Sequence, residues 1–176
     1  MGKVTPLNPT EEAIWRSLML ILRLLPRHLE NDLWRATGLT SSEYTTIMNL
    51  SEAPEGGLRM ADLADAAGLS PSRTTRLIDD LEARGLVCRE TSATDRRSNV
   101  AKLTPEGMAV LRSAWPVHLE SVRRRVFDHI DRAARKPAAE ALVAVALSLV
   151  EEGGTTPADQ RIEAIVPTPA RSRQRK

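Results

Sequence analysis

The feature that most constrains the fold is a pair of short amphipathic segments separated by a single glycine. The run LADAAGLSPSRTTRLIDDLEARGLV spans residues 63–87. Gly68 can take the left-handed backbone conformation that ends a helix, and the Ser-Pro dipeptide that follows it is typical of a helix start. A small residue at Ala64 lets the second helix cross the first at close range. The run therefore predicts a helix-turn-helix, with helices over residues 60–67 and 71–84.

The second of these helices has an apolar side and a polar side. The side expected to pack inward carries Leu69, Leu77, Ile78 and Leu81. The opposite side carries short polar groups and arginines near the helix N-terminus, the end that enters the major groove of DNA in helix-turn-helix proteins. We therefore predict that this side binds duplex DNA through Ser70, Ser72, Arg73, Thr75 and Arg76.

An alternative is that the same side is only a solvated surface. Arg76 and Asp80 stand at the i, i+4 spacing of an ion pair on one helix. Arg73 has no acid one turn away in either direction, which favours it as a contact to a base or a phosphate. Thr74 departs from the usual pattern, because helix-turn-helix proteins place an aliphatic residue at this position.

Two helices are predicted before this unit. Asn8 caps the first, within residues 8–37, and the apolar stripe of that helix is too broad for one solvent-facing side. Pro26 is expected to kink or break it. A capping box at Thr40 begins a second, short helix through Leu50. Because aromatic residues make up only 3% of the chain while Leu, Ala and Arg dominate, the core should be aliphatic and helical.

Two further helices are predicted after this unit. The first runs from Pro105 to about Ala134 and is interrupted by Pro116. The last, over residues 137–151, is apolar on nearly every side and cannot remain exposed. We therefore predict a homodimer whose dimerisation region comprises residues 8–37 and 105–151.

A charged hairpin is predicted between these two groups of helices. Residues 87–91 and 99–103 are short strand candidates that flank the sequence SATDRRS. The run 63–107 resembles the winged helix-turn-helix core of the MarR family of bacterial transcription regulators, in its Gly-Leu-Ser turn, its LEARGLV helix exit and its DRR and LT..G patterns. The resemblance implies a mainly α fold: a winged helix-turn-helix over residues 40–104 with a small β-hairpin wing, and dimerisation helices at both termini.

The resemblance also implies roles for the charges of the hairpin. In this family the hairpin is a wing that reaches the minor groove, and the D-x-R pattern falls on Asp95 and Arg97. Arg97 would enter the groove, Asp95 would hold it by a salt bridge, and Arg96 would contact a phosphate. A neighbouring carboxylate restrains an arginine before binding and so reduces the ordering entropy lost on binding. The implied function is that of a dimeric, sequence-specific DNA-binding regulator, a repressor or less often an activator, on a pseudo-palindromic double-stranded operator.

Many members of the family bind small aromatic acids in a cleft beside the DNA-binding region, and a ligand of this kind would release the protein from DNA. The candidate lining residues in this chain are Trp15, Arg16, His28, Trp34, Tyr44 and Met48. Each also fits a role in the core or on the surface, since Trp and Tyr at helical spacing are often core residues. A second class of function stays open: a winged-helix module that binds proteins without reading DNA.

Little in the sequence is typical of enzymes or metal sites. His118 and His129 are eleven residues apart, which separates them by about 16 Å along one helix. The chain contains neither H-x-x-x-H nor C-x-x-C, and Cys88 is its single cysteine. The apolar stretches are shorter than a membrane span. We therefore predict no enzyme activity, no metal, no cofactor, a cytoplasmic location, and a disordered basic tail over residues 152–176.

Overall fold

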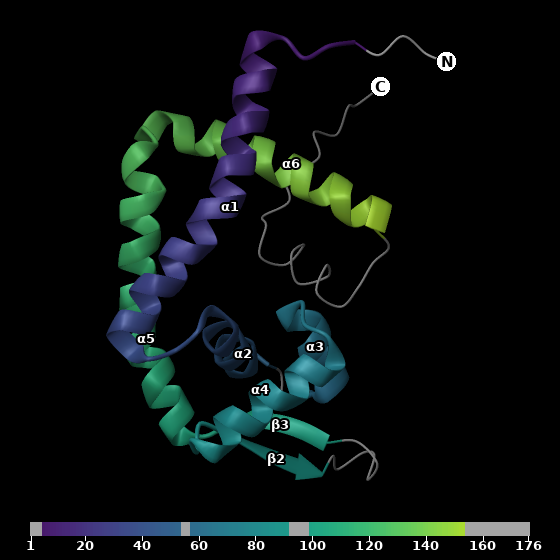
Figure 1. Cartoon of the computed structure of the whole chain (residues 1–176), viewed down its shortest axis with the longest axis vertical. Coiled ribbons are helices and arrows are strands. Elements are labelled where there is room, and N and C mark those ends of the chain that lie inside the picture. Colours follow the sequence, from purple (N-terminus) through teal and green to yellow (C-terminus); the bar gives the residue numbers. More distant parts are fainter. Residues whose placement is uncertain (1–4, 54–56, 92–98, 154–176) are drawn as a thin grey trace, which may run out of the picture.

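The computed structural model describes residues 5–53, 57–91 and 99–153 of the 176-residue chain. Two long helices, α1 and α5, lie side by side; α6 crosses near one end of them and the shorter elements gather at the other (Figure 1). The fold is mainly α with a small antiparallel sheet, as predicted. The elements are α1 (Pro9–Thr37), α2 (Ser41–Ser51), β1 (Gly57–Arg59), α3 (Met60–Ala67), α4 (Pro71–Ala83), β2 (Val87–Thr91), β3 (Asn99–Leu103), α5 (Pro105–Arg125), the 3-10 turns η2 (Phe127–His129) and η3 (Arg132–Ala134), and α6 (Arg135–Gly153).

Side-chain caps begin α1, α2, α4 and α5 at the predicted residues. The Asn8 Oδ1 accepts from the N–H groups of Thr10 (2.9 Å) and Glu11 (3.0 Å), and the Glu11 carboxylate accepts in return from the Asn8 N–H (2.8 Å). Thr40 and Glu43 form the same reciprocal box at the start of α2. These bonds satisfy N–H groups that a helix leaves unpaired at its first turn, so the start of each helix is encoded locally.

Pro26 does not break the first helix, contrary to one of the two outcomes expected for it. α1 continues through Pro26 to Thr37, and its axis changes direction along its length (Figure 1). Proline removes one backbone hydrogen bond and pushes against the preceding turn, and a helix can absorb both effects by bending. Pro116 likewise lies inside a continuous α5 and does not interrupt it.

The end of α5 was predicted too late in the chain. The helix stops at Arg125 rather than near Ala134, and two 3-10 turns lead to α6, which begins at Arg135 rather than Pro137. The Arg135 guanidinium donates to the carbonyl oxygens of Phe127 (2.7 Å) and Ile130 (3.1 Å). This arginine therefore satisfies carbonyl groups at the bend, a contact that helix propensity does not reveal.

The sheet contains one strand more than the two that were predicted. β3 lies in the middle, paired antiparallel with β1 on one side and β2 on the other, with Leu58 and Arg89 both opposite Ala101. Gly57 is required in β1, because a Cβ there would lie 2.7 Å from side-chain atoms of Val100 and Lys102. The sheet thus fixes the root of the hairpin on the rest of the fold.

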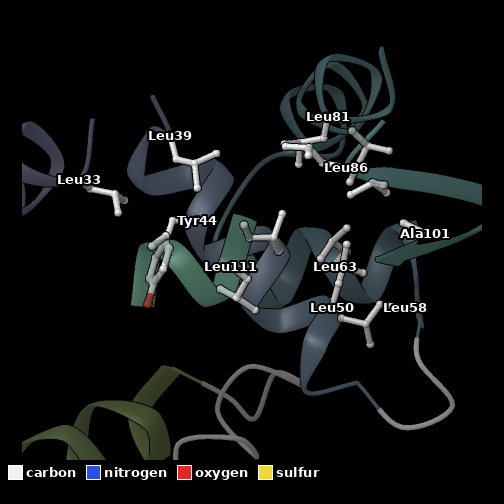
Figure 2. Close-up of a cluster of buried hydrophobic side chains, with 14 residues drawn as sticks. Leu33, Leu39, Tyr44, Leu50, Leu58, Leu63, Leu81, Leu86, Ala101 and Leu111 are labelled. Carbon is white, nitrogen blue, oxygen red and sulfur yellow. The ribbon is translucent and has the colours of Figure 1, made fainter. Parts of the chain in front are cut away.

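The core lies among the short elements rather than between the long helices. We call α2, α3, α4 and the three strands the head. Buried side chains from these elements converge with others from α5 and from the end of α1 (Figure 2). The fully buried members include Leu39, Ile47, Leu50, Leu63, Ile78 and Leu81. α1, which is described in full, buries only Leu33.

One carboxylate joins the two long helices. Asp32 of α1 accepts hydrogen bonds from the Ser121 hydroxyl (2.6 Å), Arg124 (2.9 Å) and Arg125 (2.9 Å), all of α5. The Ser121 hydrogen bond, together with the two guanidinium groups, lowers the pKa of Asp32 from 3.8 to about 2, although burial opposes the shift. The charged form of Asp32 is therefore the form that the fold stabilises.

This contact gives the stability of the protein a defined pH dependence. Because the folded pKa lies below the unfolded one, the contribution of Asp32 is complete above about pH 4 and is lost as the pH falls towards about 2. We expect Asp32→Asn to be less stable than wild type at neutral pH, with a difference that shrinks over that acidic range. Urea unfolding followed by circular dichroism measures it, with the exposed Asp128→Asn as control. A difference independent of pH would mean that the charge of Asp32 does not contribute.

Candidate nucleic-acid interface

The turn between α3 and α4 has the geometry that the glycine predicts. Gly68 has φ of 64°, and the Leu69 N–H donates to the Ala64 carbonyl (2.9 Å), which closes the end of α3. The Ser70 hydroxyl then accepts from the Arg73 N–H (3.4 Å) at the start of α4. These contacts leave the first turn of α4 exposed to solvent.

The two sides of α4 differ in burial as predicted. Thr74, Ile78 and Leu81 are buried, whereas Leu69 and Leu77 are half-buried. The structure brings five of the predicted DNA-binding residues together on exposed positions at the N-terminal end of this helix: Ser70, Ser72, Arg73, Thr75 and Arg76. Packing of the apolar side against the head therefore orients the polar side outward.

The arginines of this exposed side are free to bind an external partner. Among the described residues, the side chains of Arg73 and Arg76 form neither an ion pair nor a hydrogen bond, and the Arg76–Asp80 pair of the alternative interpretation is not formed. The neighbouring acid Asp79 is paired instead with Arg89 of β2 (2.6 Å). Two unpaired guanidinium groups near a helix N-terminus create a local positive field on a chain whose net charge is only +2.

Thr74 fits its buried position in spite of its hydroxyl. It is 1% exposed, and its Oγ1 donates to the Ser70 carbonyl (3.1 Å), so the polar atom is satisfied by the backbone of its own helix. The departure from the usual aliphatic residue therefore does not disturb the packing of α4.

An ion pair that the sequence does not predict holds the C-terminal end of α4. The Arg84 guanidinium donates to the buried Glu43 carboxylate (2.7 Å), and Glu43 also accepts from the N–H (2.7 Å) and the hydroxyl (3.0 Å) of Thr40. The sequence indicates Glu43 only as a capping residue, because its partner lies on a distant helix. This pair connects α4 to the start of α2 and so to the end of α1.

The hairpin is described up to its root. β2 and β3 pair from Val87↔Leu103 to Thr91↔Asn99, and Lys102 of β3 forms an ion pair with Glu90 of β2 (2.7 Å). The residues to which the resemblance assigns wing contacts, Asp95, Arg96 and Arg97, lie outside the described residues. Their roles stay predictions.

The candidate effector-binding residues lie in different surroundings in the described part of the chain. Trp15 and Trp34 are more than half exposed, and Arg16 pairs with Glu12 (2.6 Å) on the surface of α1. His28 lines an apolar groove of about 820 Å³ between α1, α5 and α6, whereas Met48 lines a separate pocket of about 310 Å³ between α2 and α5.

Tyr44, the remaining candidate, is a core residue. It is 4% exposed and its ring packs on His118 of α5, with ring centroids 4.8 Å apart. Burial raises the pKa of Tyr44 to about 12 and lowers the pKa of His118. Both groups are thus favoured in their neutral forms, and they join α2 to α5 by packing.

Over the described ranges 5–53, 57–91 and 99–153, no group of three or more His, Cys, Asp or Glu side chains could hold a metal ion. No helix in this part of the chain is long and apolar enough to cross a membrane. Cys88 is half-buried on β2.

Comparison with known proteins agrees with this arrangement. Residues 37–98 match the model of the MarR family. The structure resembles AbsC, a MarR family transcriptional regulator from Streptomyces coelicolor, with 37% sequence identity and a TM-score of 0.73 over 83% of this chain and 98% of that one. The chain belongs to the MarR family of transcriptional regulators. A second member, Sco3205 from the same organism, was solved in complex with DNA; it is 34% identical, with a TM-score of 0.76 over 88% of this chain and 97% of that one.

Curated MarR-type relatives match a smaller part of the sequence. The transcriptional repressor MprA from Escherichia coli is 27% identical over 108 residues, which is 61% of this chain and 61% of MprA. The chain spans no more than 66% of the length of the first curated relatives it matches. The family model matches residues 37–98, which include most of the head, whereas the likeness to the two solved structures extends over 83% and 88% of the chain.

The packing of α4 makes one substitution informative. We expect Thr74→Val to change the free energy of unfolding by less than about 1 kcal/mol, because the Ser70 carbonyl still accepts from the backbone N–H at position 74 (2.9 Å). Thr74→Ala should cost more than Thr74→Val, since it also removes a buried methyl group. Thermal and urea unfolding measure both variants. A large loss in Thr74→Val would show that the hydroxyl itself is required.

Proposed function

We propose that this MarR-family member is a homodimeric, sequence-specific DNA-binding repressor that reads duplex DNA through the exposed side of α4. The observation that carries the proposal is that Arg73 and Arg76 have no ion-pair partner among the described residues, on a helix whose other side is part of the core. The fold presents these cations outward without neutralising them, which is typical of a surface that meets phosphates and base edges.

The end of α4 that carries these residues suits an anionic partner. Its first turn contains no acid, and the hydroxyls of Ser70 and Ser72 lie beside the partial positive charge of the helix N-terminus. In the proposed complex Ser70, Ser72, Arg73, Thr75 and Arg76 face the major groove and adjoining phosphates. The hairpin adds Arg97 in the minor groove, restrained by Asp95, and Arg96 on a phosphate. The DNA complex of Sco3205 supports this class of partner.

A second copy of the chain is the proposed occupant of the apolar surfaces at the far end of the molecule. Large side chains are exposed along the N-terminal half of α1 and along α6: Ile14, Trp15, Ile21, Leu22, Leu142, Val145 and Leu149. The groove of about 820 Å³ that separates these helices is lined mainly by leucine and isoleucine. Covering such a surface favours association. A twofold dimer would present two heads to half-sites about one helical turn apart.

A small aromatic or phenolic effector is the proposed regulator. The pocket of about 310 Å³ between α2 and α5 is lined by apolar side chains, one cation, one acid and one hydroxyl: Met48, Met108, Leu111, Trp115, Arg112, Glu52 and Ser51. Arg112 suits a ligand carboxylate or phenolate, and the apolar side chains suit a ring. Such a ligand would release the protein from DNA if it binds more tightly to a head arrangement that does not fit the operator. The repressor role is supported by the similarity to MprA.

Salt dependence separates DNA binding from the alternative, a winged-helix module that binds only proteins. We expect the affinity for a duplex selected from a random pool to fall steeply with salt. The logarithm of the binding constant should fall with the logarithm of the salt concentration, with a slope of about 0.9 for each phosphate contacted. Arg73→Ala and Arg76→Ala should each weaken binding by about 1–3 kcal/mol, with the slope reduced by about 1 where the lost contact is to phosphate. Fluorescence anisotropy measures both, and Arg27→Ala on α1 is the control. Wild-type protein that ignores every duplex in dilute buffer would favour the alternative.

The proposed dimer is tested on α6. We expect Leu142→Glu to yield monomers, because Leu142 is 60% exposed and a buried carboxylate without a partner opposes association. Sedimentation velocity measures the oligomeric state, with Ala144→Glu on the opposite side of the same helix as the matched control. A stable dimer of Leu142→Glu would mean that the interface lies elsewhere.

A further inference from the structure

Arg89, on the strand that follows α4, contacts that helix at three successive turns. Its guanidinium donates to the carboxylates of Asp79 (2.6 Å) and Glu82 (2.8 Å) and to the Thr75 carbonyl (3.3 Å). Its backbone N–H donates to the other oxygen of Glu82 (3.1 Å). We call this set of contacts the Arg89 bridge.

The Arg89 bridge runs along one stripe of α4, the proposed DNA-recognition helix. Its acceptors occur four and then three residues apart, at Thr75, Asp79 and Glu82, and so they lie above one another over about 10 Å of helix. One rigid, planar guanidinium that is held at several points along a helix fixes the direction of its strand relative to that helix, as well as the distance between them. The bridge therefore sets the angle between α4 and the strand that carries Arg89.

That strand leads directly into the hairpin. Arg89 stands opposite Ala101 in the β2–β3 ladder, two residues before the last described pair, Thr91↔Asn99. The angle at Arg89 is accordingly passed to the whole hairpin through the backbone ladder. Lys102 and Glu90 also form an ion pair in this ladder, but both belong to the hairpin, so their contact does not involve α4.

Arg89 is poorly placed to bind DNA itself. Its side chain is 23% exposed, and two carboxylates already occupy its terminal nitrogens. A phosphate could reach it only by displacing charge-assisted hydrogen bonds. The geometry instead assigns Arg89 a role that acts through other residues.

We propose that Arg89 is a positioning residue, which aligns the hairpin with the recognition helix so that both engage one DNA half-site at the same time. This inference rests on the proposed DNA-binding function. Without the bridge, α4 keeps its own contacts, because its apolar side is still packed in the head. The hairpin keeps its root in the sheet but loses the contact that sets its angle to α4, so forming both sets of DNA contacts at once costs additional entropy.

The direction in which one substitution changes the affinity for DNA separates a positioning role from simple electrostatics. Asp79→Ala removes a negative charge beside the DNA-facing helix, so electrostatics alone predicts tighter binding to DNA, whereas loss of the bridge predicts weaker binding. Glu90→Ala is the matched control, since the Asp79 and Glu90 side chains are both 54% exposed and Glu90 has no part in the bridge. We expect Asp79→Ala to weaken binding at least about threefold, and Glu90→Ala to leave it unchanged or slightly tighter.

Substitution of Arg89 itself tests which groove is affected. We expect Arg89→Met to weaken binding between about threefold and thirtyfold with a salt slope close to that of wild type, because no phosphate contact is lost. Arg89→Lys should recover little, since an ammonium group cannot span both carboxylates in the same geometry.

Methylation of the bound DNA by dimethyl sulfate reports on both grooves, at guanine N7 in the major groove and adenine N3 in the minor groove. At a saturating concentration of the Arg89→Met variant, we expect guanine N7 to stay protected while adenine N3 becomes reactive.

The outcomes distinguish this inference from the proposed function. Wild-type protein that binds no duplex refutes the proposed function. Wild-type binding with an Asp79→Ala variant that binds equally or more tightly refutes the positioning role alone, as does equal loss of protection in both grooves for Arg89→Met. Circular dichroism melting confirms that each variant is folded. If Arg89→Met fails to fold, Asp79→Ala and Arg89→Lys decide the matter, since each leaves the Glu82 contact available.

Discussion

Burial of one side of α4 is the constraint on which the rest of the structure depends. Ile78 and Leu81 are completely buried in one cluster with Leu63 and Leu50, and each such side chain contributes about 1.5–3 kcal/mol on leaving water. Once these residues are buried, the period of 3.6 residues per helical turn places Arg73 and Arg76 on the exposed side of α4. The exposure of the cations is thus a consequence of packing, and it needs no separate device to hold them outward.

The head and the long helices are stabilised in different ways. The head contains a closed core of aliphatic residues, whereas α1 buries only Leu33 and joins α5 through the contacts of Asp32 with Ser121, Arg124 and Arg125. Much of the remaining apolar surface of α1 and α6 is exposed in the single chain. A helix pair with so small an interior has little stability of its own. This imbalance supports the proposal that a second copy of the chain covers the long helices, whereas the core of the head is closed within one chain.

The sequence predicts what is encoded locally and misses what depends on distant contacts. The caps at Asn8, Thr40, Ser70 and Thr104, the turn at Gly68 and the burial of Ile78 and Leu81 follow from residues within one or two turns of one another, and the structure confirms them. The continuity of α1 and α5 through their prolines, the early end of α5 and the strand β1 do not follow, because packing and the contacts of Arg135 decide them. The same limit applies to the site. Its exposed residues on α4 could be predicted, but the partners of Arg84 and Arg89 could not, and the predicted wing contacts at Asp95, Arg96 and Arg97 lie outside the described residues.

The two arginines that were missed connect α4 to the elements on either side of it. Arg84 binds Glu43, whose carboxylate also caps α2 at Thr40, immediately after the end of α1. Arg89 binds Asp79 and Glu82 from the strand that leads to the hairpin. A rotation of α2 relative to α4 must therefore break a charge-assisted hydrogen bond to a buried carboxylate or carry α4 with it. Because the proposed effector pocket lies between α2 and α5, a ligand that shifts α2 would act on α4 through Glu43. It would act on the hairpin through Arg89 and through the sheet, which α2 contacts directly.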